Sequence, residues 1–142
     1  MLIAKNPEFE QFVKTAVLTM PAAMHLGFHF GHIAAGEVEL VQPYRKELTE
    51  HNGFFQGGVL GSLADFAGGA AAGTLLPVGW VNMTADYTVK LLAPAEGDNV
   101  IARGRVVKPG RAITVATVDV YSSETHCATA LVTMRNVPLV TE

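Results

Sequence analysis

The chain has 142 residues, of which 49% are hydrophobic and only 16% are charged. This length indicates one domain spanning residues 1–142, and the high apolar fraction excludes intrinsic disorder. Ten Lys and Arg residues against thirteen Asp and Glu residues give a net charge of −3 without any basic stretch, so we expect no nucleic-acid partner.

The first predicted element is an amphipathic helix over about residues 8–19. Its apolar side chains recur every three to four positions on one face: Phe9, Phe12, Val13, Ala16 and Val17. Proline restricts the residue before it and cannot continue a helical ladder, so Pro21 ends this helix. Two strands follow at residues 27–34 and 37–42, and residues 43–50 are predicted to be an exposed polar loop.

A central helix is predicted over about residues 57–76, the longest apolar tract of the chain. Apolar residues recur there at three- and four-residue spacing: Val59, Leu60, Leu63, Ala67, Ala70 and Ala71. Glycine destabilises a helix interior by about 0.5–1 kcal/mol relative to alanine. The interior of this helix nevertheless contains Gly61, Gly68, Gly69 and Gly73. We infer that the helix is buried and that another backbone comes very close to it.

The rest of the chain is predicted to be a sheet meander. Its strands cover residues 81–92, 99–107, 112–121 and 125–137. Proline and glycine make Lys108-Pro109-Gly110-Arg111 a tight turn, and Ser122-Ser123-Glu124 is a second turn. Helices segregated from an antiparallel sheet describe an α+β fold.

One segment, from His51 to Asp65, concentrates the residues that could carry chemistry. It holds three polar loop residues, two glycines that open the helix, and one acid: His51, Asn52, Gln56, Gly57, Gly58 and Asp65. The first N–H groups of a helix are unpaired and carry partial positive charge, and glycines let a carbonyl approach them, which is the geometry of an oxyanion site. A lone carboxylate in so apolar a segment often acts as a base or nucleophile.

Gly57 and Asp65 are too far apart on one helix to act on the same atom. Eight residues span about 12 Å at 1.5 Å per residue, whereas reacting groups lie about 3 Å from a shared atom. Two such helices, packed antiparallel across a two-fold axis, would bring Gly57 of one chain to Asp65 of the other, with the glycine-rich face providing the close approach. This arrangement predicts an obligate homodimer with two equal sites.

The segment HNGFFQGGVLGSLADFAGG resembles the signature of PaaI-type acyl-CoA thioesterases in the hotdog-fold superfamily. That signature has an Asn or Gln, a Gly, then His-Gly-Gly, and a helix with Leu-Ala-Asp nine residues after the His. VNMTADYTVKLLAPAEGD and RGRVVKPGRAITVATVDVY resemble the family's next strand and hairpin, so the resemblance covers about residues 40–137. It implies a hotdog fold, in which a long antiparallel sheet wraps one central helix.

The resemblance also implies hydrolysis of an acyl-CoA thioester, with coenzyme A as part of the substrate and no metal or organic cofactor. It assigns Asp65 as general base or nucleophile, and the Gly57 N–H as the oxyanion donor. Asn52 would position the substrate or water, and Thr84 on the following strand would support the water or the acid. A dimer of dimers, hence a homotetramer, is implied as well.

Two departures from the family pattern fall in the loop. Gln56 occupies the position of the family's His, although its amide can still donate and accept hydrogen bonds. The loop upstream is about two residues shorter, so either Asn52 or His51 could fill the family's amide position. Gly58 is the second glycine of the pattern and is expected to line the substrate site.

Other polar residues give weaker signals. Lys108 and Arg111, at the tip of the predicted turn, are either simply solvated or, by analogy, contact a CoA phosphate. His25, His29 and His32 lie close in sequence but form no coherent ligand set, so we expect no metal site.

Nothing in the sequence indicates export or membrane insertion. Its single cysteine, Cys127, cannot form an internal disulfide and is expected to be a packed strand residue. The first residues lack the apolar run of a signal peptide, and residues 57–76 are too rich in glycine and polar residues for a membrane span. We expect a cytoplasmic protein with no membrane partner.

Two other functions fit the same fold. One is a non-catalytic acyl-CoA-binding sensor, which a fused DNA-binding segment would favour, and this sequence has none. The other is dehydration or hydration of a hydroxyacyl thioester, but no His–acid pair of the kind used by such enzymes can be placed in the sequence.

Overall fold

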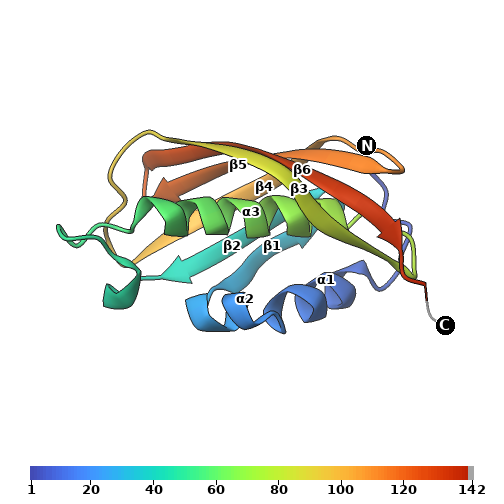
Figure 1. Ribbon diagram of the computed structural model, residues 1–142, viewed down its shortest axis with the longest axis horizontal. Helices are drawn as coiled ribbons and strands as arrows, with labels where there is room; N and C mark the ends of the chain where they lie inside the picture. Colours follow the sequence, from blue (N-terminus) through green and yellow to red (C-terminus); the bar gives the residue numbers. More distant parts are fainter. Residues whose placement is uncertain (141–142) are drawn as a thin grey trace.

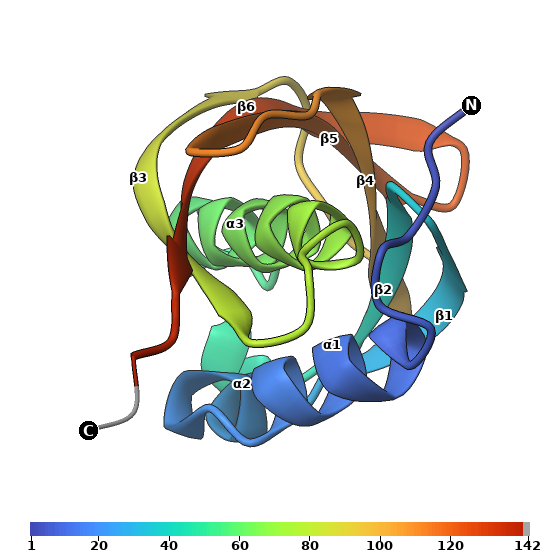
Figure 2. The same cartoon turned by 90° about the vertical axis from the view of Figure 1, so that its right-hand side faces the viewer.

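A curved antiparallel sheet surrounds one long helix in the computed structural model, which describes residues 1–140. The sheet wraps α3 (Gly57–Gly73), while α1 (Phe9–Leu18) and α2 (Pro21–Leu26) cover the side of α3 that the sheet leaves open (Figure 1, Figure 2). The strand order is β1-β2-β4-β5-β6-β3. The strands are β1 (His29–Ala34), β2 (Glu37–Pro43), β3 (Trp80–Leu91), β4 (Asn99–Lys108), β5 (Ile113–Ser122) and β6 (Thr125–Pro138).

The helices begin and end close to the predicted residues, except that α2 was not predicted. Pro21 follows the end of α1, as expected, and it also opens α2, where a proline loses no helical hydrogen bond. Gly27 then ends α2 in the left-handed region, at φ 80°. Helix α3 ends at Gly73, three residues earlier than predicted. The buried Thr74 hydroxyl accepts from the Gly36 amide at 2.7 Å, which fixes the chain as it leaves the helix.

The close backbone approach predicted for the glycine-rich helix occurs within the chain. A Cβ atom placed on Gly104 of β4 would lie 2.5 Å from the Ala67 carbonyl oxygen, so β4 crosses the helix at contact distance. On the helix itself, a Cβ atom on Gly68 would lie 2.8 Å from the Val132 side chain of β6. The buried glycines of α3 therefore face the chain's own sheet and, at Gly73, helix α1, so the expectation that this face brings two chains together is wrong.

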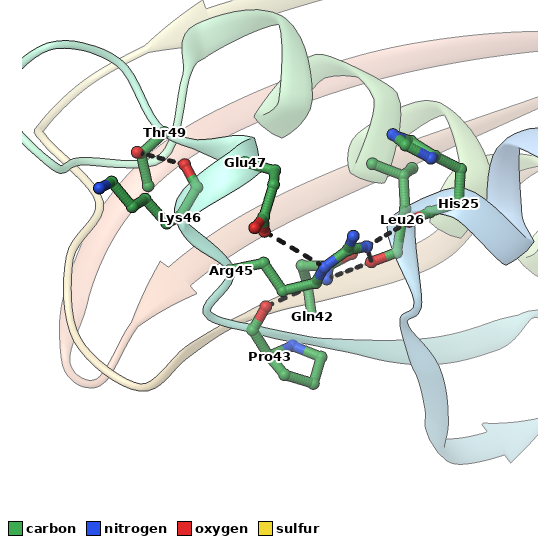
Figure 3. A network of polar contacts seen from close by, with 8 residues as sticks. All are labelled: His25, Leu26, Gln42, Pro43, Arg45, Lys46, Glu47 and Thr49. Atoms are coloured by element: carbon green, nitrogen blue, oxygen red, sulfur yellow. Dashed lines mark hydrogen bonds and ion pairs between the residues drawn. The ribbon is translucent and has the colours of Figure 1, made fainter.

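Helix α2 is fastened to β2 and to the following loop by polar contacts (Figure 3). Gln42, fully buried on β2, donates from Nε2 to the Leu26 carbonyl at 2.7 Å. Arg45 donates to the Leu26 carbonyl at 3.1 Å and to the His25 carbonyl, and Glu47 lies 3.7 Å from its guanidinium. A cation beside the last carbonyls of a helix is stabilising. These contacts hold the N-terminal helices against the sheet.

β3 is an edge strand: it pairs with β6 on one side, and no other strand of residues 1–140 pairs with its second side. Its last residue, Leu91, packs beside the start of α3, where a Cβ atom on Gly57 would lie 2.7 Å from Leu91 Cδ1. Several apolar side chains of this strand are exposed, including Met83 (53%), Tyr87 (42%) and Leu91 (56%). An exposed apolar edge with unpaired backbone groups is a surface on which another strand can pair.

Candidate active site

Asp65 and Thr84 meet between α3 and the edge strand β3. Asp65 lies in the third turn of α3, and the Thr84 hydroxyl donates a hydrogen bond of 2.7 Å to its Oδ1 atom. The pairing of β3 with β6 shifts register between Thr84 and Asp86, and a bulge of this kind re-aims the side chains next to it. The acid and the supporting hydroxyl assigned from the resemblance are therefore direct neighbours.

This pair forms part of the wall of an apolar cavity of about 390 Å³ bounded by α1, α3 and β3. Asp65 is half-buried, and burial raises the pKa of its carboxyl, while the hydrogen bond from Thr84 acts in the opposite direction. Once ionised, a carboxylate with a raised pKa is a stronger base than an exposed one. Asp65 thus has the environment of a base or nucleophile next to a space large enough for a ligand.

The first turn of α3 presents unpaired N–H groups. Gln56 caps the helix, and its Oε1 atom accepts from the Val59 amide at 3.1 Å. The first helical N–H groups have no acceptor within a helix, so this cap leaves the amides of Gly57 and Gly58 available to another acceptor. A Cβ atom on Gly58 would lie 2.8 Å from Gln56 Oε1, so a larger residue there would disturb the cap.

The loop before α3 is organised by Glu50, a residue that the sequence did not single out. Glu50 accepts from the Asn52 side chain (2.9 Å), the Asn52 amide (2.7 Å) and the Phe54 amide (3.1 Å). Desolvation would raise the pKa of Glu50, but these hydrogen bonds and the nearby His51 hold it below its usual range. Asn52 and His51 are both exposed, and in the single chain the Asn52 amide is engaged in the loop.

Within one chain these residues form two separate groups. Asp65 and Thr84 lie beside the cavity, whereas Gln56, Gly57 and Gly58 lie with the loop at the start of α3. Because α3 is one continuous helix, the Gly57 amide and Asp65 are about 12 Å apart along its axis. Of residues 1–140, none from the first turn of α3 lines the cavity beside Asp65. A single chain therefore holds the candidate residues in two separate groups, each of which could be one half of a site.

Lys108 and Arg111 lie outside both half-sites. Lys108 is the last residue of β4, and Arg111 lines a second cavity of about 560 Å³ at the C-terminal end of α3. This second cavity is otherwise lined mainly by the N-terminal segment and by the connection from α3 to β3, including Trp80. The contact of these cations with a CoA phosphate stays a prediction.

Among residues 1–140, no group of three or more His, Cys, Asp or Glu side chains is placed to hold a metal ion. Instead His32 pairs with Glu37 at 3.1 Å and His126 with Asp119 at 2.9 Å. None of the helices in this range combines the length and the apolar character needed to cross a bilayer.

More than half of the chain matches a known protein family. A family model described as the thioesterase superfamily matches residues 52–129, which include the start of α3, Asp65 and Thr84. The chain belongs to the thioesterase superfamily. A relative from Halobacterium salinarum, named as an esterase, is 38% identical over 102 residues, covering 68% of this chain and 67% of the relative. Membership of this superfamily indicates a hydrolase of acyl thioesters.

Solved structures agree with this assignment. A thioesterase family protein from Silicibacter pomeroyi superposes with a TM-score of 0.88 at 34% identity, covering 92% of this chain and 98% of the other. The PaaI protein of E. coli, from the phenylacetic acid degradation operon, superposes with a TM-score of 0.83 at 18% identity, covering 94% and 96%. The second similarity concerns the fold alone. The hotdog fold predicted from the sequence is confirmed.

Sequence reasoning missed the part of the site that comes from α1 and β6. Phe12 and Ala16 line the cavity from α1, Met20 from the link between α1 and α2, and Met134 from β6, with its Sδ atom 3.5 Å from Thr84 Oγ1. The apolar stripe that predicts α1 includes Phe12 and Ala16, but a stripe shows only which face is apolar and not that a cavity lies under it. All four residues lie outside the segment matched by the thioesterase superfamily model.

Proposed function

We propose that this chain hydrolyses an acyl-CoA thioester to a free acid and CoA, as a homodimer and without a metal or organic cofactor. The observation that most supports this proposal is the Asp65–Thr84 pair. Its carboxyl is half-buried, has a raised pKa, is hydrogen-bonded at 2.7 Å and lies in the wall of an apolar cavity. Thioester hydrolysis requires a base next to a place where an apolar acyl group avoids water, and the chain offers both here.

Asp65 can act in either of two ways. As general base, it takes a proton from a water molecule while the water oxygen attacks the carbonyl carbon. The C–S bond then breaks, and the proton on Asp65 passes to the departing CoA sulfur. As nucleophile, Asp65 attacks the carbonyl itself, CoA leaves, and water hydrolyses the resulting anhydride. Both routes start from the ionised carboxylate, and Thr84 orients it.

The charge that develops on the carbonyl oxygen needs donors that Asp65 does not provide. We assign this role to the Gly57 N–H of the partner chain, because an amide at a helix start is unpaired and lies at the positive end of the helix dipole. Gly58 leaves room for the carbonyl group to approach. Donors placed in this way are often the largest single contribution to acyl-transfer catalysis.

The edge strand β3 offers a way to join the two half-sites. Its Thr84 end contacts Asp65, and its Leu91 end packs beside Gly57. Two copies of β3 that pair antiparallel about a two-fold axis near Tyr87 would place the Thr84 end of one strand beside the Leu91 end of the other. This pairing would also cover the exposed apolar side chains of the strand. It replaces the glycine-rich face as the proposed contact between chains.

The remaining residues have supporting roles in the proposal. Gln56, with either Asn52 or His51, would position the substrate or the water at the partner's acid. Lys108 or Arg111 would contact a CoA phosphate through their positive charge. A homotetramer made of two such dimers would keep every site intact.

Mixing two inactive variants tests the shared site. Asp65→Asn should lower kcat about 10³-fold, because an amide cannot take the proton from water. Gly57→Pro should lower it about 10²-fold, because proline has no N–H. In a heterodimer of the two variants one site combines an intact acid with an intact donor, so activity should return to about half of the wild-type value per dimer. CoA release is followed with a free-thiol assay over a panel of acyl-CoA thioesters.

Asp86→Asn is the matched control, because it removes another carboxylate from the same strand as Thr84, and it should leave turnover near wild type. Verified heterodimers that stay inactive would contradict the shared site. A fully active Asp65→Asn dimer would contradict the role of the acid. Wild-type protein that binds acyl-CoA tightly without turning it over would favour the acyl-CoA-binding alternative.

A further inference from the structure

Helix α1 lines one side of the cavity beside Asp65. Val13 packs α1 directly onto α3, where a Cβ atom on Gly73 would lie 3.4 Å from Val13 Cγ2. Ala16, further along α1, and Met20, in the link between α1 and α2, line the same cavity. The polar contacts of Arg45 and Gln42 with the end of α2 hold the two N-terminal helices in place (Figure 3). These contacts fix the distance across the cavity between α1 and Gly69 of α3.

We propose that this cavity holds the acyl group of the substrate and that Ala16 and Gly69 limit the length of the acyl group that fits. The protein would then prefer medium-length, unsubstituted aliphatic acyl groups. This inference rests on the proposed thioester hydrolysis, because the cavity opens next to the acid assigned to that reaction. It goes further by naming the acyl class and the two residues that select it.

The chemistry of the wall excludes polar acyl groups. Among residues 1–140, Asn82 is the one polar side chain of the wall besides Asp65 and Thr84, and its Nδ2 atom already donates to the Gly69 carbonyl at 3.1 Å. A hydroxyl group on an aromatic or branched acyl group would be buried without a partner wherever it lies away from Asn82, Asp65 and Thr84, which costs about 1–3 kcal/mol. An unsubstituted hydrocarbon has no such penalty.

The size and the flexibility of the wall favour a chain over a ring. Met20 and Met134 both line the cavity, and methionine side chains adapt to flexible apolar ligands. The volume is about 390 Å³. If a methylene group occupies ~30 Å³, the volume of one water molecule in the liquid, the cavity accepts on the order of ten carbons. A volume of this size lies in the lower part of the usual range of ligand pockets. We therefore expect the best substrates to have acyl groups of about 6 to 12 carbons.

Two substitutions shorten the cavity from opposite sides. Ala16→Leu adds bulk at a position of α1 that lines the cavity and is solvent-exposed in the single chain, and leucine suits a helix. Gly69→Ala adds one methyl group beside Met134, whose flexible Cε atom would lie 3.2 Å away and can move. Ala22→Leu is the matched control: it is the same substitution on an exposed position of α2 that does not line the cavity.

The test compares kcat/KM for saturated acyl-CoA thioesters from two to sixteen carbons and for benzoyl-CoA. It also measures the affinity of S-decyl-CoA, a thioether that cannot be hydrolysed. We expect a wild-type optimum at a medium chain length. Ala16→Leu should lower the decanoyl-to-butyryl ratio of kcat/KM about tenfold or more and weaken S-decyl-CoA binding about equally. Gly69→Ala should lower both by a smaller factor, and Ala22→Leu should change neither.

The outcomes separate this inference from the proposed function. Hydrolysis with a length profile that neither cavity variant shifts, or with benzoyl-CoA as the best substrate, would overturn the inference and leave the reaction standing. S-decyl-CoA binding that Ala16→Leu weakens, in a protein that hydrolyses none of the thioesters, would support the cavity assignment and overturn the reaction. Binding unaffected by either cavity variant, without hydrolysis, would overturn both.

Discussion

The first and third turns of α3 have contrasting surroundings. The first turn is at the surface: Gln56 is exposed, the amides of Gly57 and Gly58 have no helical acceptor, and the loop carboxyl of Glu50 is already engaged by its own hydrogen bonds. The third turn is half-buried beneath α1 and β3 and carries Asp65, but amides this far inside a helix are paired along it. One region has donors without a base, and the other has a base without donors.

This contrast explains why one chain is not enough for the proposed chemistry. The helix between the two regions is continuous and packed against the sheet, so it cannot bend to bring them together. The edge strand β3 contacts both regions, and within residues 1–140 no strand pairs with its second side. In the proposed homodimer a second copy of the chain supplies what each region lacks, and the predictions below act on one region at a time.

After the loss of the acid itself in Asp65→Asn, the largest effect on activity is expected from a change that removes one N–H group from the first turn. Gly57 is the first helical residue, a position that proline tolerates, and Gln56 before it is extended (φ −68°, ψ 141°), as a residue before proline should be. Gly57→Pro should therefore fold normally and lower kcat about 10²-fold with little change in KM. Steady-state CoA release at several substrate concentrations measures both constants.

Gly57→Ala is the matched control for this substitution. It introduces the same Cβ atom next to the Leu91 side chain but keeps the N–H, so it should retain most of the activity. Equal losses in the two variants would trace the defect to the contact with Leu91, and the amide would then have no part in stabilising the oxyanion.

A smaller effect is expected from the third turn when Asp65 loses its hydrogen-bond donor. Thr84→Val removes the hydroxyl that stabilises the ionised carboxylate and leaves the burial that opposes ionisation, so the pKa of Asp65 should rise further. Because the reaction needs the ionised form, the acidic limb of the profile of kcat/KM against pH should move to higher pH. Activity near neutrality should fall about tenfold, the effect of losing one hydrogen bond to a charged group.

Thr84→Ser keeps a hydroxyl at this position and should restore both the pH profile and the rate. A Thr84→Val enzyme with lower activity but an unchanged acidic limb would give Thr84 a purely structural role. That outcome would also weaken the assignment of the limb to Asp65.

Local patterns predicted most of the fold. The three- to four-residue spacing of apolar side chains located α1 and α3, and alternation with turn residues located the strands. Helix α2 was missed because six residues are too few to show a periodicity, and because Pro21 was interpreted only as the end of a helix. The glycines of α3 correctly indicated a close backbone approach. They could not indicate which backbone, and it proved to be β4 at Gly104.

The candidate site was predictable only where its residues lie close in sequence or follow a family pattern. The spacing from Gly57 to Asp65 and the strand position of Thr84 are of this kind, and Thr84 does contact Asp65. The cavity could not be predicted, because it depends on how α1 packs against α3. That packing is made by the contact of Val13 with Gly73, two residues sixty positions apart in the sequence. The role of Glu50 in the loop depends likewise on the folded geometry of hydrogen bonds.

The smallest effect is on stability, and it follows from the burial of Asp65. Its pKa is higher in the folded than in the unfolded chain, so the folded state binds the proton more tightly, and the free energy of unfolding falls as the pH rises from the unfolded to the folded pKa. Asp65→Asn removes this loss while its amide oxygen can still accept from Thr84. The variant should melt a few degrees higher than wild type at neutral pH and equally at acidic pH, where Asp65 is protonated in both states.

A double-mutant cycle uses this small effect to test whether Gly57 of one chain lies beside Asp65 of its partner. Within one chain Gly57 and Asp65 lie about 12 Å apart along the helix, and substitutions more than about 7–10 Å apart without shared partners add within about 0.3–0.5 kcal/mol. If the partner's Gly57 amide faces Asp65, it stabilises the carboxylate, and Gly57→Pro removes that stabilisation. Asp65→Asn should then raise the melting temperature more in the Gly57→Pro background than in the wild-type background. Strict additivity in the dimer would mean that the two residues do not meet across the interface, since a single chain cannot couple them.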